Sequence, residues 1–418
     1  MIDLHAARDD PQRFRDALAR KGAAELFDEL LETDRAVRDV QPKVEELRAR
    51  RKVKGKPSPE QLVELEQVKT ELQRLEAQLA EAETKRRELL DRIPNLPDDD
   101  TPDGFTDADA VELRRIGEPP TFDFPARNHL ELASVYGWPM IDVERGAKVS
   151  GSRFVYRLGD VALLELALYR FAIDRLLTRG FTPVLPPVLV REDAMYGTGF
   201  LPTDEVNIYA IERDGLYLTG TSEVAIAAMR SDEELDEDAL PIRYAGYSTC
   251  FRREAGAAGK DLGGMFRVHQ FDKVEMFVFT KAEWSRDEHE RLLEIEEELV
   301  QELELPYRVV NIAAGDLGAS AAKKYDIEGW FPGQGRYREL TSTSNTTDYQ
   351  ARRANIRFRR GGDRLEHVHT LNGTAVTARA MLAIMENYQE EDGSFSVPEP
   401  LVELGAPARL TPAATVRG

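Results

Sequence analysis

The N-terminal part of the chain shows a hydrophobic pattern typical of two long paired helices. Apolar residues recur at alternating steps of three and four over Leu26–Leu47 and again over Leu65–Ile93, with polar residues elsewhere. Between them, Lys54–Pro59 holds two prolines and a glycine, which cannot continue a helix, and Ser58 is expected to cap the second helix. We therefore expect an antiparallel helical hairpin, with about 25 residues per helix and an arm of roughly 40 Å.

A proline- and aspartate-rich segment, Ile93–Gly104, follows the second helix. Such segments interrupt regular structure, so we place a domain boundary near it. This gives an N-terminal domain of residues 1–106 and a C-terminal domain of residues 107–418. Ahead of the hairpin, the pattern favours a short amphipathic helix over Asp9–Arg20.

The C-terminal domain shows a mixed pattern of strands and helices. A helix is expected to open at Arg127–His129, and Gly146–Tyr156 indicates a turn and a strand. Leu163–Leu177 is apolar enough for a largely buried helix, and it leads into Thr182–Pro187, a strand broken by proline. Helices and strands therefore share this domain.

The stretch Thr249–Phe279 contains two strand-like runs joined by a glycine-bearing loop, which predicts a hairpin. Its second run alternates charged and apolar residues, so charges such as Glu275 lie among apolar neighbours. Burying charges is unfavourable unless each has a partner or a ligand. Arg252 suits a bidentate grip on a phosphate or carboxylate, and Glu275 can accept from an ammonium or a hydroxyl. A structural ion-pair network across the hairpin is the alternative.

Three further stretches end in hydroxyl-rich or small residues: Thr219–Glu223, Arg338–Asn345 and Leu371–Arg379. Each also has a structural interpretation. The hydroxyls of the first can cap a helix that starts at Glu223, and the second can be a polar turn. An arginine that opens a helix, such as Arg379, is often a surface residue.

Composition narrows the class of protein. The chain has 418 residues, a hydrophobic fraction of 42% and a formal net charge of −20, which fits a globular protein and opposes broad nucleic-acid binding. No apolar run is long enough to span a membrane, and no secretory signal is visible, so a cytoplasmic location without membrane or DNA partners is expected. The single cysteine, Cys250, excludes an internal disulfide and a multi-cysteine zinc site.

The tip of the expected hairpin is basic although the chain is acidic. Between Lys43 and Lys56, only Glu45 and Glu46 oppose a cluster of lysines and arginines. The cluster consists of Lys43, Arg48, Arg50, Arg51, Lys52, Lys54 and Lys56. It can contact a phosphate backbone, or it can be the solvated surface of a coiled coil.

The stretch from Thr249 resembles motif 2 of class II aminoacyl-tRNA synthetases, in the form FR-x-EAG, loop, R-x-HQF-x-KVEM found in seryl-tRNA synthetases. Leu163–Pro187 resembles motif 1, which forms a dimer interface in that family, and Leu371–Asn387 resembles motif 3. The resemblance implies the α+β fold class, with an antiparallel sheet of about six strands flanked by helices and preceded by the N-terminal antiparallel coiled-coil hairpin. It also implies that the hairpin grips the long variable arm of a tRNA.

The resemblance implies a serine–tRNA ligase, which activates L-serine with ATP and transfers it to tRNA(Ser), with tRNA(Sec) as a further candidate. The implied catalytic residues are Arg252, Arg379 and Glu275. The implied serine site consists of Thr221, Ser222, Glu223, Arg252, Glu275, Asn345 and Thr374. The implied ATP site consists of Arg252, Arg253, Glu254, Val268, Glu339, Leu340, Thr341, Ser342 and Arg379. Mg²⁺ would bind with ATP at Glu339 and Ser342, and tRNA would bind the basic cluster at the hairpin tip.

Some features depart from the family pattern. The motif 2 loop has Leu262-Gly263-Gly264 where the family often has an arginine, Ala225 replaces a frequent proline, and the arm is shorter than usual. These departures suggest an alternative, a paralogue that supplies activated serine or seryl-tRNA to antibiotic biosynthesis or self-resistance. A non-catalytic coiled-coil interaction protein is a second alternative. The motif arginines and glutamates, all retained, weigh against it.

Overall fold

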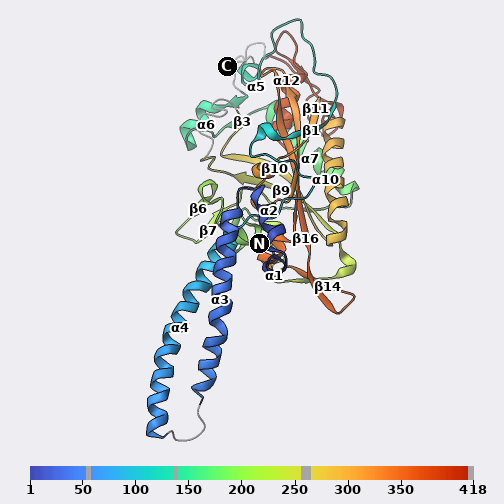
Figure 1. Ribbon diagram of the computed structural model, residues 1–418. Coiled ribbons are helices and arrows are strands. Elements are labelled where there is room, and N and C mark those ends of the chain that lie inside the picture. The colour runs from blue at the N-terminus through green and yellow to red at the C-terminus, as the bar shows by residue number, and fades with distance from the viewer. Residues whose placement is uncertain (53–57, 135–139, 256–264, 413–418) are drawn as a thin grey trace. The chain divides into compact units, whose positions relative to one another are not determined.

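The computed structural model describes residues 1–52, 58–134, 140–255 and 265–412 (Figure 1). The chain divides into two compact units, Met1–Pro97 and Asp98–Gly418. Each unit is described by itself below.

The first unit is a helical hairpin with two short helices ahead of it. The long helices are α3 (Ala24–Arg50) and α4 (Pro59–Arg92), and the short ones are α1 (Leu4–Asp9) and α2 (Pro11–Ala19). The expected hairpin is confirmed, and Ser58 caps α4 through a reciprocal pair of hydrogen bonds with Gln61. The helix expected over Asp9–Arg20 is confirmed as α2, which begins at Pro11 because Asp10 ends α1 and caps α2. The helix α1 ahead of it was not expected.

The hairpin is held by a heptad seam and by a charged cluster at its base. The seam of the distal part consists of Val37, Val40, Val44, Leu72, Leu75 and Leu79. Nearer the termini, Phe14 and Leu18 of α2 pack against both long helices. Asp34 is fully buried there, and Arg8, Arg38 and Arg86 donate to its carboxylate at 2.7 to 3.2 Å. A buried carboxylate with three cationic donors is well compensated, so these contacts tie α1 to both arms of the hairpin.

The boundary between the units follows Pro97, so the boundary expected between residues 106 and 107 lies inside the second unit. The reason is that the second half of the linker joins the sheet. The Asp98 amide donates to the Ala322 carbonyl at 2.8 Å, and Asp100 pairs with Lys323 at 2.6 Å. An aspartate-rich stretch therefore serves as structure here as well as linker.

The second unit is built on an eight-stranded sheet. The strand order is β1-β11-β12-β13-β16-β10-β9-β4, and every neighbouring pair is antiparallel except β4 with β9. In that order the strands are β1 (Val111–Ile116), β11 (Tyr307–Asn311), β12 (Lys323–Phe331), β13 (Arg336–Thr347), β16 (His369–Thr377), β10 (Gln270–Thr280), β9 (Ile242–Phe251) and β4 (Thr182–Val184). The α+β class and the antiparallel sheet are confirmed, with two more strands than the six expected.

The two faces of the sheet differ because side chains alternate along each strand. On β10, Val274, Met276 and Val278 belong to a core with the helices α7 (Asp160–Thr178), α10 (Ser285–Glu302) and α12 (Ala378–Asn387). Phe277 and Phe279 point the other way, into a smaller core with α9 (Glu223–Ala228) and α11 (Tyr349–Ala354). The long helices therefore cover one face, and the rest of the opposite face carries the cavity described below.

Smaller elements surround the sheet. The helices are α5 (His129–Ser134), α6 (Val143–Ser150), α8 (Glu192–Thr198) and α13 (Glu399–Val402). The strand pairs and triplets are β2 (Ile141–Asp142) with β3 (Tyr156–Arg157), β5 (Leu189–Arg191) with β7 (Leu216–Leu218) and β6 (Tyr209–Ile211), β8 (Glu234–Leu235) with β14 (Arg357–Arg360) and β15 (Arg364–His367), and β17 (Phe395–Ser396) with β18 (Arg409–Leu410).

Two expectations about local structure need correction. Gly146 lies inside α6 and does not begin a turn; the expected turn and strand follow the helix, at Ser152 and Arg153 and in β3. Only glycine fits at position 146, because a Cβ there would lie 1.9 Å from the Phe154 carbonyl oxygen. The helix expected to be largely buried, α7, buries one face and exposes another, where Leu163 is 48% and Leu166 is 59% exposed. None of the helices in the described ranges is long and apolar enough to cross a membrane.

Candidate active site

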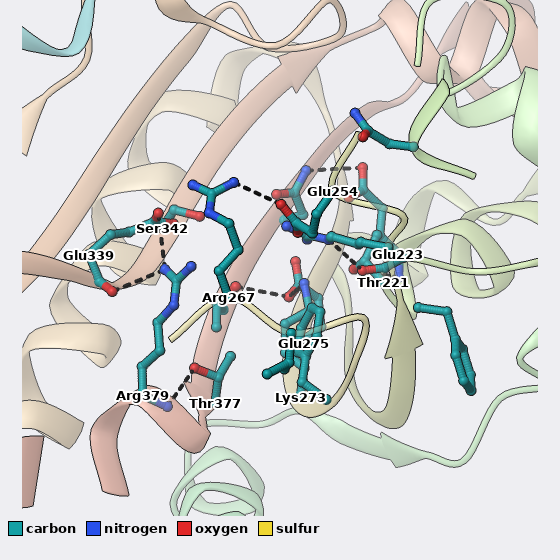
Figure 2. Close-up of a pocket in the computed structure, with 18 of the residues that line it drawn as sticks. Thr221, Glu223, Glu254, Arg267, Lys273, Glu275, Glu339, Ser342, Thr377 and Arg379 are labelled. Carbon is teal, nitrogen blue, oxygen red and sulfur yellow. Dashed lines mark hydrogen bonds and ion pairs between the residues drawn. The ribbon is translucent and has the colours of Figure 1, made fainter. Parts of the chain in front are cut away.

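A cavity of about 530 Å³ opens on the face of the sheet that α7, α10 and α12 leave free (Figure 2). Its lining comes from segments far apart in the chain: Gly220 and Thr221 before α9, Glu223 at the first position of α9, Arg252 after β9, Lys273 and Glu275 on β10, Glu339 and Ser342 on β13, Asn372 and Thr374 on β16, and Arg379 at the start of α12. The sheet therefore brings together the stretches that the sequence singled out separately.

Glu275 forms one end of the cavity and has one oxygen already occupied. Lys273 forms an ion pair with its Oε2, and Thr374, directly opposite on β16, donates to the same atom at 3.2 Å. Glu275 is 2% exposed. No residue in the described part of the chain bonds to Oε1, so this oxygen remains an acceptor for a ligand.

Glu223 repeats this arrangement on the neighbouring wall. Gln350 and Asn372 donate to its Oε1 at 2.6 and 3.2 Å. Burial, and then the charge of Glu275, raise the pKa of Glu223 to about 7. A cation between the two carboxylates would relieve both effects, so the pair suits an ammonium group.

Arg252 provides the central positive charge of the cavity. Its Nε donates to the Gly220 carbonyl at 3.2 Å, and its guanidinium lies over the Phe271 ring at 5.3 Å. Among the residues that the structure describes, no carboxylate pairs with it. The side chain is oriented by a carbonyl and an aromatic face, which leaves its terminal nitrogens for an anionic ligand.

The other end of the cavity carries Glu339 and Arg379. Arg379 approaches Glu339 Oε2 at 3.1 Å and shares the lining with Lys324 and Ser342. Burial alone would raise the pKa of Glu339, but the charges of Arg379 and Lys324 outweigh it and lower this pKa to about 2. Glu339 is therefore ionised at neutral pH.

The ring of Phe266, which lines this part of the cavity, contacts two guanidinium groups. The guanidinium of Arg379 lies 4.9 Å from the centre of the Phe266 ring, and that of Arg338 lies 3.9 Å from it. Phe331 packs edge-on against the same ring. Close by, Arg267 donates to Glu254 at 2.7 Å (Figure 2). A flat, cation-lined surface of this kind suits a heteroaromatic ring that carries phosphates.

Glu339 and Ser342 share the cavity face only because of a bulge. Residues three apart on a regular strand point to opposite faces. The pairing of β12 with β13 shifts register between Thr341 and Glu339, which leaves Leu340 as the extra residue. Both side chains then line the cavity.

The side-chain oxygens of Glu339 and Ser342 fit a magnesium ion that binds together with a nucleotide. The set contains a carboxylate that is ionised at neutral pH and a hydroxyl, which are hard oxygen donors. Within the described ranges there is no group of three or more metal-ligating His, Cys, Asp or Glu side chains. Such a set suits an ion that takes its remaining ligands from phosphate and water.

Most, but not all, of the expected site residues lie in the cavity lining. Thr221, Glu223, Arg252, Glu254, Val268, Glu275, Glu339, Leu340, Ser342, Thr374 and Arg379 do. Four do not: three of them have side chains that bond elsewhere, and the fourth, Arg253, is exposed. Ser222 donates to the Gly246 carbonyl, and Arg253 contributes a backbone hydrogen bond to Asn207.

The other two, Thr341 and Asn345, lie on the helix-covered face of β13. Thr341 donates to Glu296 of α10 at 2.9 Å, and the Asn345 amide donates to Ser285 at 2.8 Å. Alternation along the strand after the bulge places them there.

Sequence reasoning assigned no role to several lining residues. These are Lys273, Lys324, Phe266, Phe271 and Asn372, together with Gln350 behind Glu223. The alternation of β10 was the available signal for Lys273, since it stands two residues before Glu275 on the same face. Gln350 gave no signal, because its contact with Glu223 depends on how α11 packs.

The residues expected to bind tRNA lie at the end of the hairpin in the first unit. Arg48 pairs with Glu76 at 2.8 Å and Arg50 with Glu64 at 3.0 Å. Lys43, Arg51 and Lys52 are exposed, and none of them makes an ion pair with a described residue. Lys54 and Lys56 lie outside the described residues.

Comparison with known proteins identifies the class of the second unit. Residues 209–388 match the family model for the tRNA synthetase class II core domain (G, H, P, S and T). The antiparallel sheet and the cavity on it are thus those of a class II aminoacyl-tRNA synthetase. Residues 1–97 match the model for the seryl-tRNA synthetase N-terminal domain, which ends where the first compact unit ends.

Full-length relatives narrow the class to one family. The serine–tRNA ligase of Thermobifida fusca is 49% identical over 410 residues, which cover 96% of each chain. The crystal structure of seryl-tRNA synthetase from Pyrococcus horikoshii, complexed with ATP, superposes with a TM-score of 0.91 at 41% identity, over 99% of this chain and 100% of that one. The serine–tRNA ligase of Naegleria fowleri, in complex with AMP, gives a TM-score of 0.83 at 32% identity over 97% and 96%. The chain belongs to the seryl-tRNA synthetase family, as the motifs predicted.

Proposed function

We propose that this chain is a serine–tRNA ligase, which activates L-serine with ATP and transfers the seryl group to tRNA. One observation supports this most strongly. Arg252 lines one cavity together with Glu223 and Glu275 and with Glu339 and Arg379, and its charge opposes the rise in the pKa of Glu223 and contributes to the low pKa of Glu339. Arg252 therefore lies within electrostatic reach of the amino-acid end and of the phosphate end. A group at that position can hold a carboxylate and a phosphate together.

The first step needs positioning more than proton transfer. The serine carboxylate, already ionised, attacks the α-phosphorus of ATP, a carboxylate oxygen–phosphorus bond forms, and the bond to the β-phosphate oxygen breaks. Seryl-adenylate and pyrophosphate result. Arg252 stabilises the charge that develops at the α-phosphate, and Arg379 that on the departing pyrophosphate. Phe266, Phe271 and Val268 offer the apolar surface for the adenine.

The two buried carboxylates account for the choice of amino acid. Glu223 and Glu275 each have one oxygen held by protein donors and one oxygen left for a ligand. Together with Thr221 and Thr374, these can accept the ammonium and the hydroxyl of serine. A site that hydrogen-bonds a substrate hydroxyl rejects analogues that lack it by about 10⁴-fold or more. Alanine and glycine should therefore be poor substrates.

Mg²⁺ would be held by Glu339 and Ser342 and would supply charge neutralisation on the phosphate oxygens of ATP. The residues of this chain prepare for it before it binds. Arg379 and Lys324 keep Glu339 ionised, and the bulge at Leu340 turns Ser342 toward the same side.

In the second step, a hydroxyl of the terminal adenosine of tRNA attacks the carbonyl carbon of the adenylate. The new ester bond forms and AMP leaves. We propose that the hairpin of the first unit binds the body of the tRNA through its cations. These are Lys43, Arg48, Arg50, Arg51 and Lys52, and the sequence adds Lys54 and Lys56. tRNA(Ser) is the expected substrate, and tRNA(Sec) is the second candidate.

We further propose a cytoplasmic homodimer. The exposed leucines of α7, Leu163, Leu166 and Leu177, form an apolar face that a second copy can cover, and Leu185 just beyond it is 81% exposed. The specialised paralogue is not favoured, because relatives that match nearly the whole chain are named serine–tRNA ligases.

Serine-dependent exchange of pyrophosphate into ATP, followed by charging of total tRNA, tests the proposal. We expect exchange with L-serine and the formation of seryl-tRNA. Exchange with no amino acid would contradict the enzyme assignment, and stronger exchange with another amino acid would contradict the assignment of serine. Exchange without charging would return the paralogue to consideration.

A further inference from the structure

His129 bridges two segments that both belong to the nucleotide end of the cavity, although it does not line the cavity itself. It is the first residue of α5 and is 4% exposed. Its Nδ1 lies 2.8 Å from Glu386 Oε1, and its Nε2 lies 3.4 Å from the backbone nitrogen of Met265. A buried imidazole with a defined partner on each nitrogen has a fixed orientation and a fixed tautomer.

The partners determine that tautomer. A carboxylate only accepts, so Nδ1 carries the proton and donates to Glu386. A backbone amide only donates, so Nε2 carries no proton and accepts from Met265. Each nitrogen of the imidazole therefore has a separate partner and a separate task.

Glu386 is itself fully satisfied and rigid. It is 0% exposed, its Oε1 also accepts from the His129 amide at 3.1 Å, and its Oε2 accepts from the Gly333 amide at 3.0 Å. Three N–H donors compensate the buried charge. Gln389 adds a second tie, because it exchanges hydrogen bonds with both the amide and the carbonyl of Arg127. The backbone just before α5 is thus fixed to the end of α12.

The opposite end of α12 reaches the proposed phosphate site. Arg379 and Glu386 are seven residues apart on this helix, which is two turns, so they lie along one side of it. Met265 begins the segment that lines the cavity with Phe266, whose ring lies under the Arg379 guanidinium at 4.9 Å. The route from Glu386 through His129 to Met265 therefore closes a loop of contacts around Phe266 and Arg379.

We propose that His129 is a positioning residue for ATP. Its Nε2 holds the Met265 amide, and this fixes Phe266 and Val268 against α12 at the spacing that the adenine and its phosphates require. The inference rests on the proposed function, since it concerns one substrate of that reaction. If His129 only filled space in the core, replacing it would lower the stability of the fold or would change the KM for both substrates alike.

Two conservative substitutions separate the two nitrogens of His129. The amide of glutamine reaches about as far as Nε2, so His129→Gln can still accept from Met265 through its Oε1. The amide of asparagine reaches only about as far as Nδ1, so His129→Asn can still donate to Glu386 but leaves the Met265 amide without its acceptor. Each variant keeps one of the two contacts and loses the other, so the two variants serve as controls for each other.

The measurement is the KM for ATP and for serine in pyrophosphate exchange, with thermal unfolding of both variants. Loss of one buried hydrogen bond corresponds to about a three- to tenfold change. We expect His129→Asn to raise the KM for ATP by about that factor and to leave the KM for serine within about twofold, while His129→Gln stays near the parent for both. Titration calorimetry with ATP alone, without serine, should show that ATP binds His129→Asn more weakly than the parent by the same factor.

Equal values of the KM for ATP in the two variants would overturn the proposal, as would a parallel rise in the KM for serine. If His129→Asn does not fold, Glu386→Gln provides the test, because it weakens the acceptor that orients Nδ1, and it must also raise the KM for ATP alone. Absence of exchange by the parent enzyme would reject the proposed function, whereas a parent that is active with serine and variants that behave alike would reject only the role of His129.

Discussion

One nitrogen of Arg379, Nη1, lies 3.0 Å from the backbone carbonyl oxygen of Glu339 and 3.1 Å from its Oε2. The guanidinium of α12 is thus fastened to the bulged strand before any substrate arrives. Its other nitrogens and its position over Phe266 remain directed at the cavity. The site is preorganised for phosphate binding, which is where catalysis by charge stabilisation gains most.

Replacing Arg379 by glutamine should therefore impair adenylate formation strongly. The variant loses the charge that meets the departing pyrophosphate, and we expect kcat for exchange to fall by about 10²- to 10³-fold. Arg364→Gln is a matched control, because that arginine is 80% exposed on β15 and is not part of the cavity lining. Equal activity of the two variants would show that Arg379 does not act in the reaction.

The pKa of Glu223 predicts how serine use depends on pH. Burial and the charge of Glu275 raise this pKa to about 7, so the free enzyme holds Glu223 partly protonated at neutral pH. A serine ammonium pairs with the ionised form. The KM for serine should therefore rise as pH falls below 7, approaching about tenfold per pH unit, and should level off above it.

The KM for ATP, measured over the same pH range, is the internal control for that prediction. Glu339 has a pKa near 2 and stays ionised throughout, so the phosphate end should change little. A KM for serine that stays constant from pH 6 to pH 8 would contradict the pairing of Glu223 with the ammonium.

The hairpin should be needed for tRNA and dispensable for adenylate formation. Its base must be kept, because Phe27, Leu30, Leu89 and Ile93 pack with α2. Replacing residues 39–82 by a short turn removes most of the distal seam and keeps Asp34 together with Arg38 and Arg86. We expect pyrophosphate exchange to persist and charging of tRNA to be lost. A truncated enzyme that charges tRNA like the parent would make the arm a structural appendage.

The charges of the hairpin can be tested without truncation. Changing Arg48, Arg50, Arg51 and Lys52 to glutamine should raise the KM for tRNA and leave those for serine and ATP almost unchanged. For every phosphate that the variant no longer neutralises, the salt dependence of tRNA binding should flatten by roughly one unit of log–log slope. If this variant binds tRNA with an unchanged salt dependence, the four cations are only part of the solvated surface of the coiled coil.

The dimer proposal predicts that charges on the exposed face of α7 separate the subunits. Leu163→Glu combined with Leu166→Glu should give a monomer in light scattering at micromolar concentration, whereas the parent gives a dimer. Leu62→Glu is the control, since Leu62 is 54% exposed on α4. A monomeric parent enzyme would reject the proposal directly.

The hairpin and the motif stretches were predictable because each is a local pattern. Heptads at steps of three and four specify α3 and α4. The turn expected from proline and glycine between them lies outside the described residues. Alternation along β10 correctly placed Glu275 among buried charges, where Lys273 now pairs with it. These features depend on neighbours within a few residues.

The errors have a common physical cause: strand register and close backbone approaches depend on residues far along the chain. The bulge at Leu340 arises from pairing with β12, and it decides that Ser342 faces the cavity while Thr341 and Asn345 face α10. The close approach of Phe154 is what requires glycine at position 146. Such relations involve partners far along the chain, and a single sequence does not reveal them.

The burial of Cys250 has a practical consequence. It is the only cysteine in the chain, it lies within β9 without exposure, and burial raises the pKa of its thiol. A thiol that is neither accessible nor ionised does not react with maleimides. The natural chain therefore does not react with thiol-directed spectroscopic labels. Single cysteines introduced on α4 and at the rim of the cavity could carry a fluorophore pair, and the distance between the two units could be followed as tRNA binds.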